Sequence, residues 1–328
     1  MAMLLISDYY KLFNVNNSFI FYLCYMNRSE LIQQIHQKEN YLCIGLDTDA
    51  TKLPNHLRDS PDAVFQFNKA IIDATKDFCV SYKINTAFYE AQGVKGWEAM
   101  EQTVQYIPST HFKIADAKRG DIGNTSAQYA KTFFETLAFD AVTINPYMGE
   151  DSVRPFLEYD NKFAIVLGLT SNAGAQDFEL LHVCRTHKRK EVHTEVSKHH
   201  LIIYTQELEE EEQEKDEPLH RLYEMVMEKV SSWGTPDNLM FVAGATHAAE
   251  LSAMRRIVPD NFLLVPGVGT QGGSLQDVSE HGINNNIGLL VNVSRAVIYA
   301  SGAEDFAAQA GIAAKGYCEE MRSFVAHR

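Results

Sequence analysis

FKIADAKRGDIGNT, residues 112–125, holds a short apolar run that ends in a dense cluster of charge. If residues 112–117 form a strand, alternation places Ile114, Asp116 and Lys118 on one face. An acid and an amine would then lie side by side at the carboxyl end of the strand. An isolated Asp-x-Lys is most often a solvated ion pair, but this one lies where an apolar strand meets a glycine turn. The pattern therefore favours a functional site.

The residues after this strand predict a turn and a helix. Two glycines permit a tight turn, and Asp121 lies between them. The helix that follows reads AQYAKTFFETLA, and Asn124, Thr125 or Ser126 is expected to cap it. A strand, a turn and a helix form the repeating unit of parallel α/β folds.

Seven more segments of this kind lie along the chain. Their expected bounds are 41–49, 79–90, 140–147, 163–172, 239–246, 262–269 and 288–297. Continuous β-branched apolar runs are typical of strands covered on both faces, hence of a parallel sheet. Helical stretches separate most of them, and eight such units favour a closed barrel over an open sheet. We predict an α/β protein whose single domain is a TIM (β/α)8 barrel.

Two segments lie outside this repeat. Residues 1–25 are apolar and aromatic, but they lack the basic n-region and small-residue cleavage site of a signal peptide. Polar residues interrupt them, so no apolar run is long enough for a membrane span. We interpret them as an N-terminal extension and assign the barrel to residues 26–328, with Ser29 capping its first helix. The second segment is a charged insertion at about 181–217, between the fifth and sixth strands. A charge run is typical of a solvated, mobile segment, although LIIYTQE within it could form a strand or a helix.

Histidines in and beside the insertion raise the question of a metal site. They are His182, His187, His193, His199 and His200. Their spacing matches no helical i, i+4 pair with a nearby carboxylate motif, so we do not expect metal binding.

Composition and charge narrow the function classes. The 328 residues are 45% hydrophobic and 22% charged, which is ordinary for a globular protein with a large core. The formal net charge of −14 argues against a nucleic-acid partner and against binding to acidic membranes. The 5 cysteines lack Cys-x-x-Cys spacing and indicate reduced thiols, so we expect a cytoplasmic protein.

Polar side chains gather at the expected carboxyl ends of the strands, where barrels of this kind carry their chemistry. They are Asp47, Lys83, Asn85, Asp116, Lys118, Asn145, Ser171, Asn172, Gln271 and Arg295. Several charges converging in one barrel mouth are costly to bury unless they pair. An alternating chain would give each charge an opposite neighbour, and its expected members are Lys83, Asp116, Lys118 and Asp121.

GVGTQGG, residues 267–273, contains the pattern Gly-x-Gly-x-x-Gly. A dinucleotide site needs this pattern after the first strand of a βαβ unit, whereas here it follows the seventh strand. We therefore interpret Gly267, Gly269 and Gly272 as a backbone amide cradle for a phosphate group. Arg295, at the end of the eighth strand, would bind the same phosphate through its planar guanidinium.

Two further sets of polar residues allow two interpretations each. Thr170, Ser171 and Asn172 suit the carbonyl and N–H edge of a pyrimidine, but they could equally cap the following turn. Asp47 could accept hydrogen bonds from ribose hydroxyls or form an Asx turn with the residues after it.

DAKRGDIGNT, residues 116–125, resembles the signature of the orotidine 5'-phosphate decarboxylase family in its longer bacterial, type 2 form. Further motifs of that family agree in order, namely GLDTD at 45–49, TSN at 170–172 and VPGVGTQGG at 265–273. The resemblance covers the chain from Arg28 to the C-terminus except the insertion. It implies a cofactor-free and metal-free enzyme that converts orotidine 5'-monophosphate to uridine 5'-monophosphate and CO2 in pyrimidine biosynthesis.

The resemblance also implies a catalytic set, which comprises Lys83, Asp116, Lys118 and Asp121. Lys118 would be the proton donor to C6, because a fixed cation stabilises the carbanion that forms there and can then protonate it. Asp116 near the departing carboxylate would disfavour the ground state more than the transition state. Asp121 would reach into the neighbouring subunit's site, which implies an obligate homodimer.

The substrate-binding residues implied by the resemblance are Asp47, Asn85, Thr125, Ser171, Asn172, Gln271 and Arg295. Asp47 is expected to hold the ribose, and Thr125 to approach the ribose from the neighbouring subunit. Gln271 and Arg295 are expected at the phosphate. One departure is Ser294, where many relatives carry glycine, and we expect it to tighten the phosphate pocket slightly.

Two other functions stay open. A related barrel enzyme, such as a keto-gulonate phosphate decarboxylase or a hexulose phosphate synthase, shares Asp-x-Lys-x-x-Asp but uses magnesium. The TSN motif and Lys83 argue against it, and sensitivity to EDTA would separate the two. The third possibility is a nucleotide-binding regulator on a barrel without activity, and the complete set of charged residues counts against it.

Overall fold

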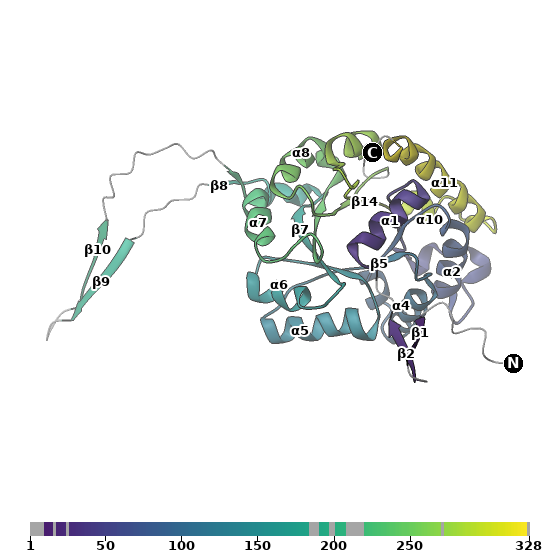
Figure 1. The fold of residues 1–328 in the computed structure, drawn as a ribbon, viewed down its shortest axis with the longest axis horizontal. Helices are drawn as coiled ribbons and strands as arrows, with labels where there is room; N and C mark the ends of the chain where they lie inside the picture. The colour runs from purple at the N-terminus through teal and green to yellow at the C-terminus, as the bar shows by residue number, and fades with distance from the viewer. Residues whose placement is uncertain are drawn as a thin grey trace.

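Eight parallel strands close into a barrel with helices around it (Figure 1). The computed structural model describes residues 10–15, 18–23, 26–183, 190–196, 201–207, 220–269 and 272–326. The barrel strands are β3 (Leu42–Gly45), β4 (Ser81–Asn85), β5 (Phe112–Arg119), β6 (Ala141–Ile144), β7 (Phe163–Leu169), β12 (Leu239–Ala243), β13 (Leu263–Pro266) and β14 (Leu289–Val293). Each pairs in parallel with its neighbours, and β14 pairs with β3 to close the ring. The predicted TIM barrel is confirmed.

Helices precede the first barrel strand and follow each of the eight strands. Their bounds are α1 (Arg28–Lys38), α2 (Ala63–Thr75), α3 (Ala87–Glu90), α4 (Val94–Tyr106), α5 (Gly123–Lys131), α6 (Glu150–Leu157), α7 (Leu222–Ser231), α8 (Ala248–Ile257), α9 (Leu275–Gly282), α10 (Arg295–Ile298) and α11 (Phe306–Val325). A π-helical turn, Thr132–Thr136, extends α5. The connections place the carboxyl ends of all barrel strands at one mouth.

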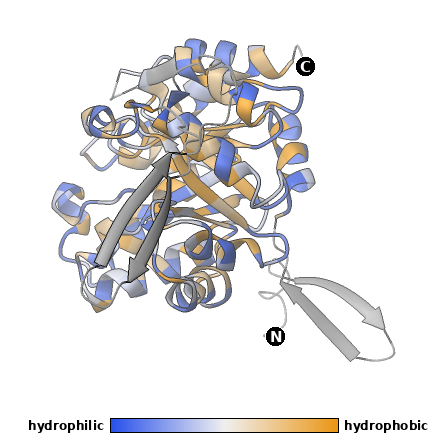
Figure 2. Cartoon of the chain, turned by 90° about the vertical axis from the view of Figure 1, so that its left-hand side faces the viewer, coloured by the Kyte–Doolittle hydropathy of each residue, from blue (hydrophilic) through white to orange (hydrophobic). Residues whose placement is uncertain are grey.

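Burial explains why the strand sequences are apolar throughout. All residues of β6, β12 and β14 are buried, because one face of each strand packs inside the barrel and the other against helices. Figure 2 shows hydrophobic residues on the central strands and hydrophilic residues over much of the surrounding helices. Helix α11 is amphipathic, since Ala310, Ala314 and Met321 recur at helical spacing and are fully buried.

Two predicted helix caps are wrong. Helix α1 is capped by Asn27, whose Oδ1 accepts from the Glu30 N–H at 3.0 Å, while Glu30 Oε2 accepts from the Asn27 N–H at 3.0 Å. This reciprocal capping box displaces Ser29 into the first turn. Helix α5 already begins at Gly123, so its N-cap is Ile122 and no side chain caps it. Ser126 instead donates to the Asp121 carbonyl at 2.8 Å and braces the preceding turn.

Short antiparallel pairs lie in the two segments outside the barrel repeat. In the extension, β1 (Tyr10–Val15) pairs with β2 (Ser18–Leu23). In the insertion, β9 (Lys190–Val196) pairs with β10 (Leu201–Glu207), so LIIYTQE is a strand. At its base, β8 (His182–Val183) pairs with β11 (His220–Arg221). The division into extension and barrel domain, and the mobility of the insertion, stay predictions.

Metal sites and membrane spans can be assessed for the residues that the structure describes. There, no group of three or more His, Cys, Asp or Glu side chains could hold a metal ion. His187, His199 and His200 lie outside the described residues. In the same part of the chain, no helix is long and apolar enough to cross a membrane.

A half-buried lysine joins several elements at the amino-terminal end of the barrel. Lys38 Nζ donates to the carbonyls of Lys76 at 2.7 Å and Cys79 at 2.8 Å, and lies 2.8 Å from His111 Nε2. Nε2 accepts this bond only when it carries no proton; it also lies 2.8 Å from the Lys76 carbonyl, to which a protonated Nε2 would donate. Burial, and then the charge of Lys38, lower the pKa of His111 to about 3. His111 is therefore neutral in the folded protein at neutral pH.

We expect acid to destabilise the fold through His111. The unfolded chain binds this proton near the ordinary pKa of 6.5, whereas the folded chain binds it only near a pKa of about 3. The stabilisation is therefore complete above pH 6.5 and decreases below it by about 1.4 kcal/mol per pH unit. His111→Gln keeps an acceptor but does not titrate, so its free energy of unfolding should fall less steeply toward about pH 4.5. Urea unfolding over this range measures both slopes, and equal slopes would contradict the assignment.

Candidate active site

A pocket of about 250 Å³ opens at the carboxyl ends of the barrel strands. All eight strands, or the residues just after them, contribute to its lining. Ten residues predicted from the sequence line it, namely Asp47, Lys83, Asn85, Asp116, Lys118, Thr170, Ser171, Asn172, Gly267 and Arg295. Five others, Asp121, Thr125, Asn145, Gly269 and Gly272, do not line it, and Gln271 lies outside the described residues. The barrel therefore brings most of the predicted site together within one chain.

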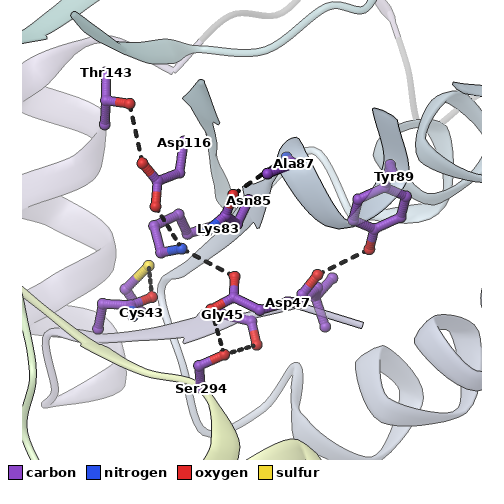
Figure 3. A network of polar contacts seen from close by, with 12 residues as sticks. Cys43, Gly45, Asp47, Lys83, Asn85, Ala87, Tyr89, Asp116, Thr143 and Ser294 are labelled. Carbon is purple, nitrogen blue, oxygen red and sulfur yellow. Dashed lines mark hydrogen bonds and ion pairs between the residues drawn. The ribbon is translucent and has the colours of Figure 1, made fainter. Parts of the chain in front are cut away.

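Lys83 is buried at the centre of this pocket between two carboxylates (Figure 3). Its Nζ lies 3.1 Å from Asp47 Oδ1 and 3.0 Å from Asp116 Oδ2, and its side chain is 3% exposed. Burial alone would lower the pKa of Lys83, but Asp116 and Asp47 offset this and hold the pKa above its ordinary value. The ammonium is therefore a permanent charge of the pocket.

Asp116 is held from three sides. Besides Lys83, its carboxylate contacts Lys118 Nζ at 2.5 Å and accepts from Thr143 Oγ1 at 3.1 Å. Burial would raise the pKa of Asp116, but Lys83 and Lys118 lower it below its ordinary range. Asp116 therefore stays ionised at neutral pH, with its position fixed by two cations and one hydroxyl.

The backbone at the end of β5 departs from simple strand alternation. Lys118 has φ of 47°, in the left-handed region, and the β5–β6 register shifts between Ala115 and Arg119. The Lys118 N–H donates to Thr143 Oγ1 at 2.9 Å, which stabilises this conformation. Alternation was therefore the wrong reason for pairing Lys118 with Asp116. The left-handed turn brings the two side chains together and leaves Lys118 50% exposed in the pocket.

The chain of ion pairs differs from the prediction at one end. Its members within this chain are Asp47, Lys83, Asp116 and Lys118, so Asp47 replaces Asp121. Asp121 Oδ1 instead accepts from the Ile122 N–H at 2.8 Å, beyond the Gly120 turn. Thr143 was missed, although alternation in the fourth strand places it on the same face as Asn145.

Ser294 orients Asp47, and its effect on the phosphate pocket stays a prediction. Its Oγ lies 2.8 Å from Asp47 Oδ2 and 2.9 Å from the Gly45 carbonyl (Figure 3). A Cβ on Gly45 would come within 2.8 Å of Ser294 Oγ, so the strand can approach this closely only with glycine at 45. One carboxylate oxygen of Asp47 thus contacts Ser294 while the other contacts Lys83.

The loop after β7 contains a carboxylate that the sequence did not reveal. Glu179 Oε2 accepts from the Thr170 N–H at 2.6 Å, and Oε1 lies 2.9 Å from Thr170 Oγ1. Thr170 Oγ1 also lies 2.7 Å from Asn172 Oδ1. No local motif marks Glu179, because it reaches back over nine residues to contact this loop.

The glycine loop after β13 is closed by its own amides. Gly267, Gly269 and Gly272 have φ of 102°, 79° and 89°, which explains the glycines. The Gly269 and Gly273 amides donate to the Gly273 and Gly267 carbonyls, both at 3.1 Å, and the Gly272 amide donates to Gly269 at 2.8 Å. In this conformation the amides of Gly269 and Gly272 are used within the loop. The amide cradle for a phosphate stays a prediction.

Arg295 is the first residue of helix α10, two residues after the end of the eighth barrel strand, β14. Its side chain is exposed and lines the pocket beside Gly267 and Val268. It forms no hydrogen bond or ion pair with the residues that the structure describes. Its guanidinium is therefore available to an anionic ligand.

Known proteins are similar to this chain in sequence and in fold. The model of the family described as "Orotidine 5'-phosphate decarboxylase / HUMPS" matches residues 40–310. A Bacteroides fragilis protein named orotidine 5'-phosphate decarboxylase is 49% identical over 299 residues, covering 90% of this chain and 97% of that protein. A Flavobacterium johnsoniae protein of the same name is 48% identical over 303 residues, covering 92% and 98%. The solved structure of Leishmania donovani OMP decarboxylase is 30% identical with a TM-score of 0.69, covering 92% of this chain and 99% of that one.

Replacing Lys83 should destabilise the protein as well as the site. Lys83→Met removes the shared partner of Asp47 and Asp116, and leaves two carboxylates facing each other in a largely buried position. We expect a loss of about 3 kcal/mol in the free energy of unfolding. Lys118→Met is the matched control, because Lys118 is half exposed and removing it leaves Lys83 on Asp116. Urea denaturation of both variants measures the difference, and equal losses would show that Lys83 has no special part in the fold.

Proposed function

Because the chain belongs to the orotidine 5'-phosphate decarboxylase / HUMPS family, we propose that it converts orotidine 5'-monophosphate to uridine 5'-monophosphate (UMP) and CO2. The enzyme is a carboxy-lyase of pyrimidine biosynthesis, and the resemblance seen in the sequence is confirmed. The observation that carries this proposal is the array of Lys83, Asp116 and Lys118 in the lining of a pocket of about 250 Å³.

Lys118 is the residue suited to the chemical step. Decarboxylation breaks the bond between C6 and the carboxylate carbon, releases CO2 and leaves the electron pair on C6. The ring offers this pair no conjugated sink, so a fixed cation beside C6 stabilises it electrostatically. The Lys118 ammonium supplies that charge, donates its proton to C6 and regains a proton from solvent, so each turnover consumes one proton. Its exposure of 50% places it within reach of a ligand in the pocket.

Asp116 and Lys83 support this step by fixing charge. An ionised Asp116 close to the substrate carboxylate disfavours the ground state, and that repulsion ends when CO2 leaves. Asp116 also holds Lys118 at 2.5 Å, which limits the positions of the ammonium. Lys83 keeps Asp116 ionised in this buried site, so its role is indirect.

We assign the other pocket residues to the ribose, the base and the phosphate of a nucleotide. Asp47 lies between Ser294 and Lys83 with its carboxylate at the pocket wall, which suits the ribose hydroxyls. The loop 170–172 faces the pocket from β7 and suits the pyrimidine edge, and Asn85 lies beside Lys83 on β4. Arg295 suits the phosphate, a contact that a planar guanidinium makes in bidentate fashion. Gln271 is proposed at the same phosphate from the resemblance alone.

We also propose a homodimer in which Asp121 and Thr125 enter the partner's pocket. Large exposed apolar side chains follow the adjacent strands β4, β5 and β6, as does the turn that carries Asp121. They are Phe88, Ile122, Tyr147 and Met148, exposed by 37%, 55%, 93% and 49% in the single chain. Exposed apolar side chains gathered on one side of a barrel mouth support a protein interface there.

The reaction is proposed to need neither a metal ion nor an organic cofactor. Two lysines supply the positive charge that magnesium supplies in the related sugar-phosphate enzymes. The absence of nucleic-acid and membrane partners and a cytoplasmic location stay predictions from charge and cysteine pattern.

The first test is the ultraviolet loss of orotidine 5'-monophosphate with purified protein in excess EDTA. We expect EDTA-resistant turnover, and Lys118→Ala should lower kcat by at least about 10³-fold while UMP still binds. Lys315→Ala is the control, since Lys315 is 58% exposed on the outer helix α11. Loss of turnover in EDTA would indicate a magnesium enzyme, and UMP binding without any turnover would indicate a regulator. Substantial activity of Lys118→Ala would remove Lys118 as proton donor.

Mixing two inactive variants tests the shared site. Lys118→Ala and Asp121→Ala should each lack activity as pure dimers. If Asp121 acts in the partner's pocket, a mixed dimer has one intact site, so random exchange restores about a quarter of the wild-type rate. Activity of an equimolar mixture after dissociation and reassociation measures this. No recovery in dimers shown to have mixed would place Asp121 in its own chain's site.

A further inference from the structure

The loop 170–172, named here the base loop, contains a hydroxyl with two competing hydrogen-bond acceptors. Thr170 Oγ1 lies 2.7 Å from the amide oxygen position of Asn172 and 2.9 Å from Glu179 Oε1. A hydroxyl carries one proton and can donate to only one of these acceptors. The orientation of the Asn172 amide depends on the direction of this proton, because a half turn of the amide exchanges its O and N positions. The base loop therefore has two states, which differ in the atom that Asn172 offers to a ligand.

Glu179 selects between these states. Its carboxylate only accepts hydrogen bonds, and it already takes the Thr170 N–H at 2.6 Å. Both carboxylate oxygens lie within 3.0 Å of Thr170 Oγ1, so the hydroxyl proton points to Glu179. The Thr170 oxygen then has only lone pairs for Asn172, which must turn its NH₂ group toward Thr170. The Asn172 oxygen is thereby left as an acceptor.

We propose that Glu179 is a specificity-determining positioning residue, which makes the base loop an acceptor for the N3–H of uracil and orotate rings and so disfavours cytosine. This inference rests on the proposed function, because it assumes that the base loop meets the pyrimidine. Uracil and orotate carry a proton on N3, whereas cytosine has a lone pair there. An acceptor on Asn172, which lines the pocket, therefore attracts the former and repels the latter.

The backbone around Glu179 is fixed well enough for this role. The Glu179 carbonyl accepts from the Tyr223 N–H at 3.0 Å, in the first turn of α7. Tyr223 is 1% exposed, and its hydroxyl donates to Glu250 at 2.8 Å. Leu180, the next residue, donates its N–H to the Ala175 carbonyl at 3.1 Å, and this bond closes the turn between the base loop and Glu179. The backbone of Glu179 is thus held by α7, while its carboxylate contacts Thr170 at the pocket.

The test replaces the carboxylate by an amide of the same shape. In Glu179→Gln, the NH₂ group donates to Thr170 Oγ1, so the hydroxyl proton turns to the Asn172 oxygen and Asn172 offers its NH₂ group instead. Calorimetry gives the dissociation constants of UMP and cytidine 5'-monophosphate (CMP). We expect the preference for UMP over CMP to fall by at least about tenfold. Ribose 5-phosphate, which has no base, should bind the variant as it binds the wild type.

Two further variants make the outcome decisive. Thr170→Val removes the hydroxyl with little change of shape, and it should also lower the UMP preference. Glu280→Gln removes the same charge on helix α9, where its carboxylate contacts Gln276 and not the base loop, so its preference should equal that of the wild type. An equal loss of UMP and CMP affinity in Glu179→Gln would show a merely structural role and overturn the proposal. If the wild-type protein neither binds UMP nor converts orotidine 5'-monophosphate, the proposed function itself fails, which is a different result.

Discussion

The burial of one ammonium group between two carboxylates constrains the rest of the barrel mouth. Lys83 is almost inaccessible to water, so its charge is tolerable only while Asp47 and Asp116 stay ionised beside it. Those two residues lie on either side of β4, at the ends of β3 and β5. The negative, positive and negative charges therefore follow the order of the three neighbouring strands. A shift of strand register at this point would separate an ion pair.

Several local irregularities are consequences of that arrangement. Ser294 approaches Asp47 so closely that position 45 has room only for glycine. Lys118 takes a left-handed backbone conformation, and Thr143 stabilises it by accepting the Lys118 N–H and donating to Asp116. Each irregularity places a polar group where a regular strand would not. Strained geometry thus coincides with the residues proposed for catalysis, as expected where position matters more than stability.

The sequence predicted the barrel and most of the pocket because those features depend on local patterns. Apolar runs of strand length mark the eight strands, and polar residues at their ends mark the mouth. What it missed depends on contacts across the chain. Asn27 displaced the predicted cap because Glu30 completes a capping box with it. Glu179 joins the pocket wall only through the folded loop, and the left-handed Lys118 follows no alternation rule.

The pairing of β8 with β11 has a consequence for the evolution of this chain. Val183 lies opposite His220, so the insertion leaves the barrel and returns to it at neighbouring points. A segment attached in this way is a side branch, whose length does not alter the spacing of the strands that flank it. The entropy cost of a longer branch grows only with the logarithm of its length, about 0.6 kcal/mol for each doubling. This position could therefore gain, lose or exchange whole modules while the catalytic barrel stays unchanged, and it is a natural graft point for protein engineering.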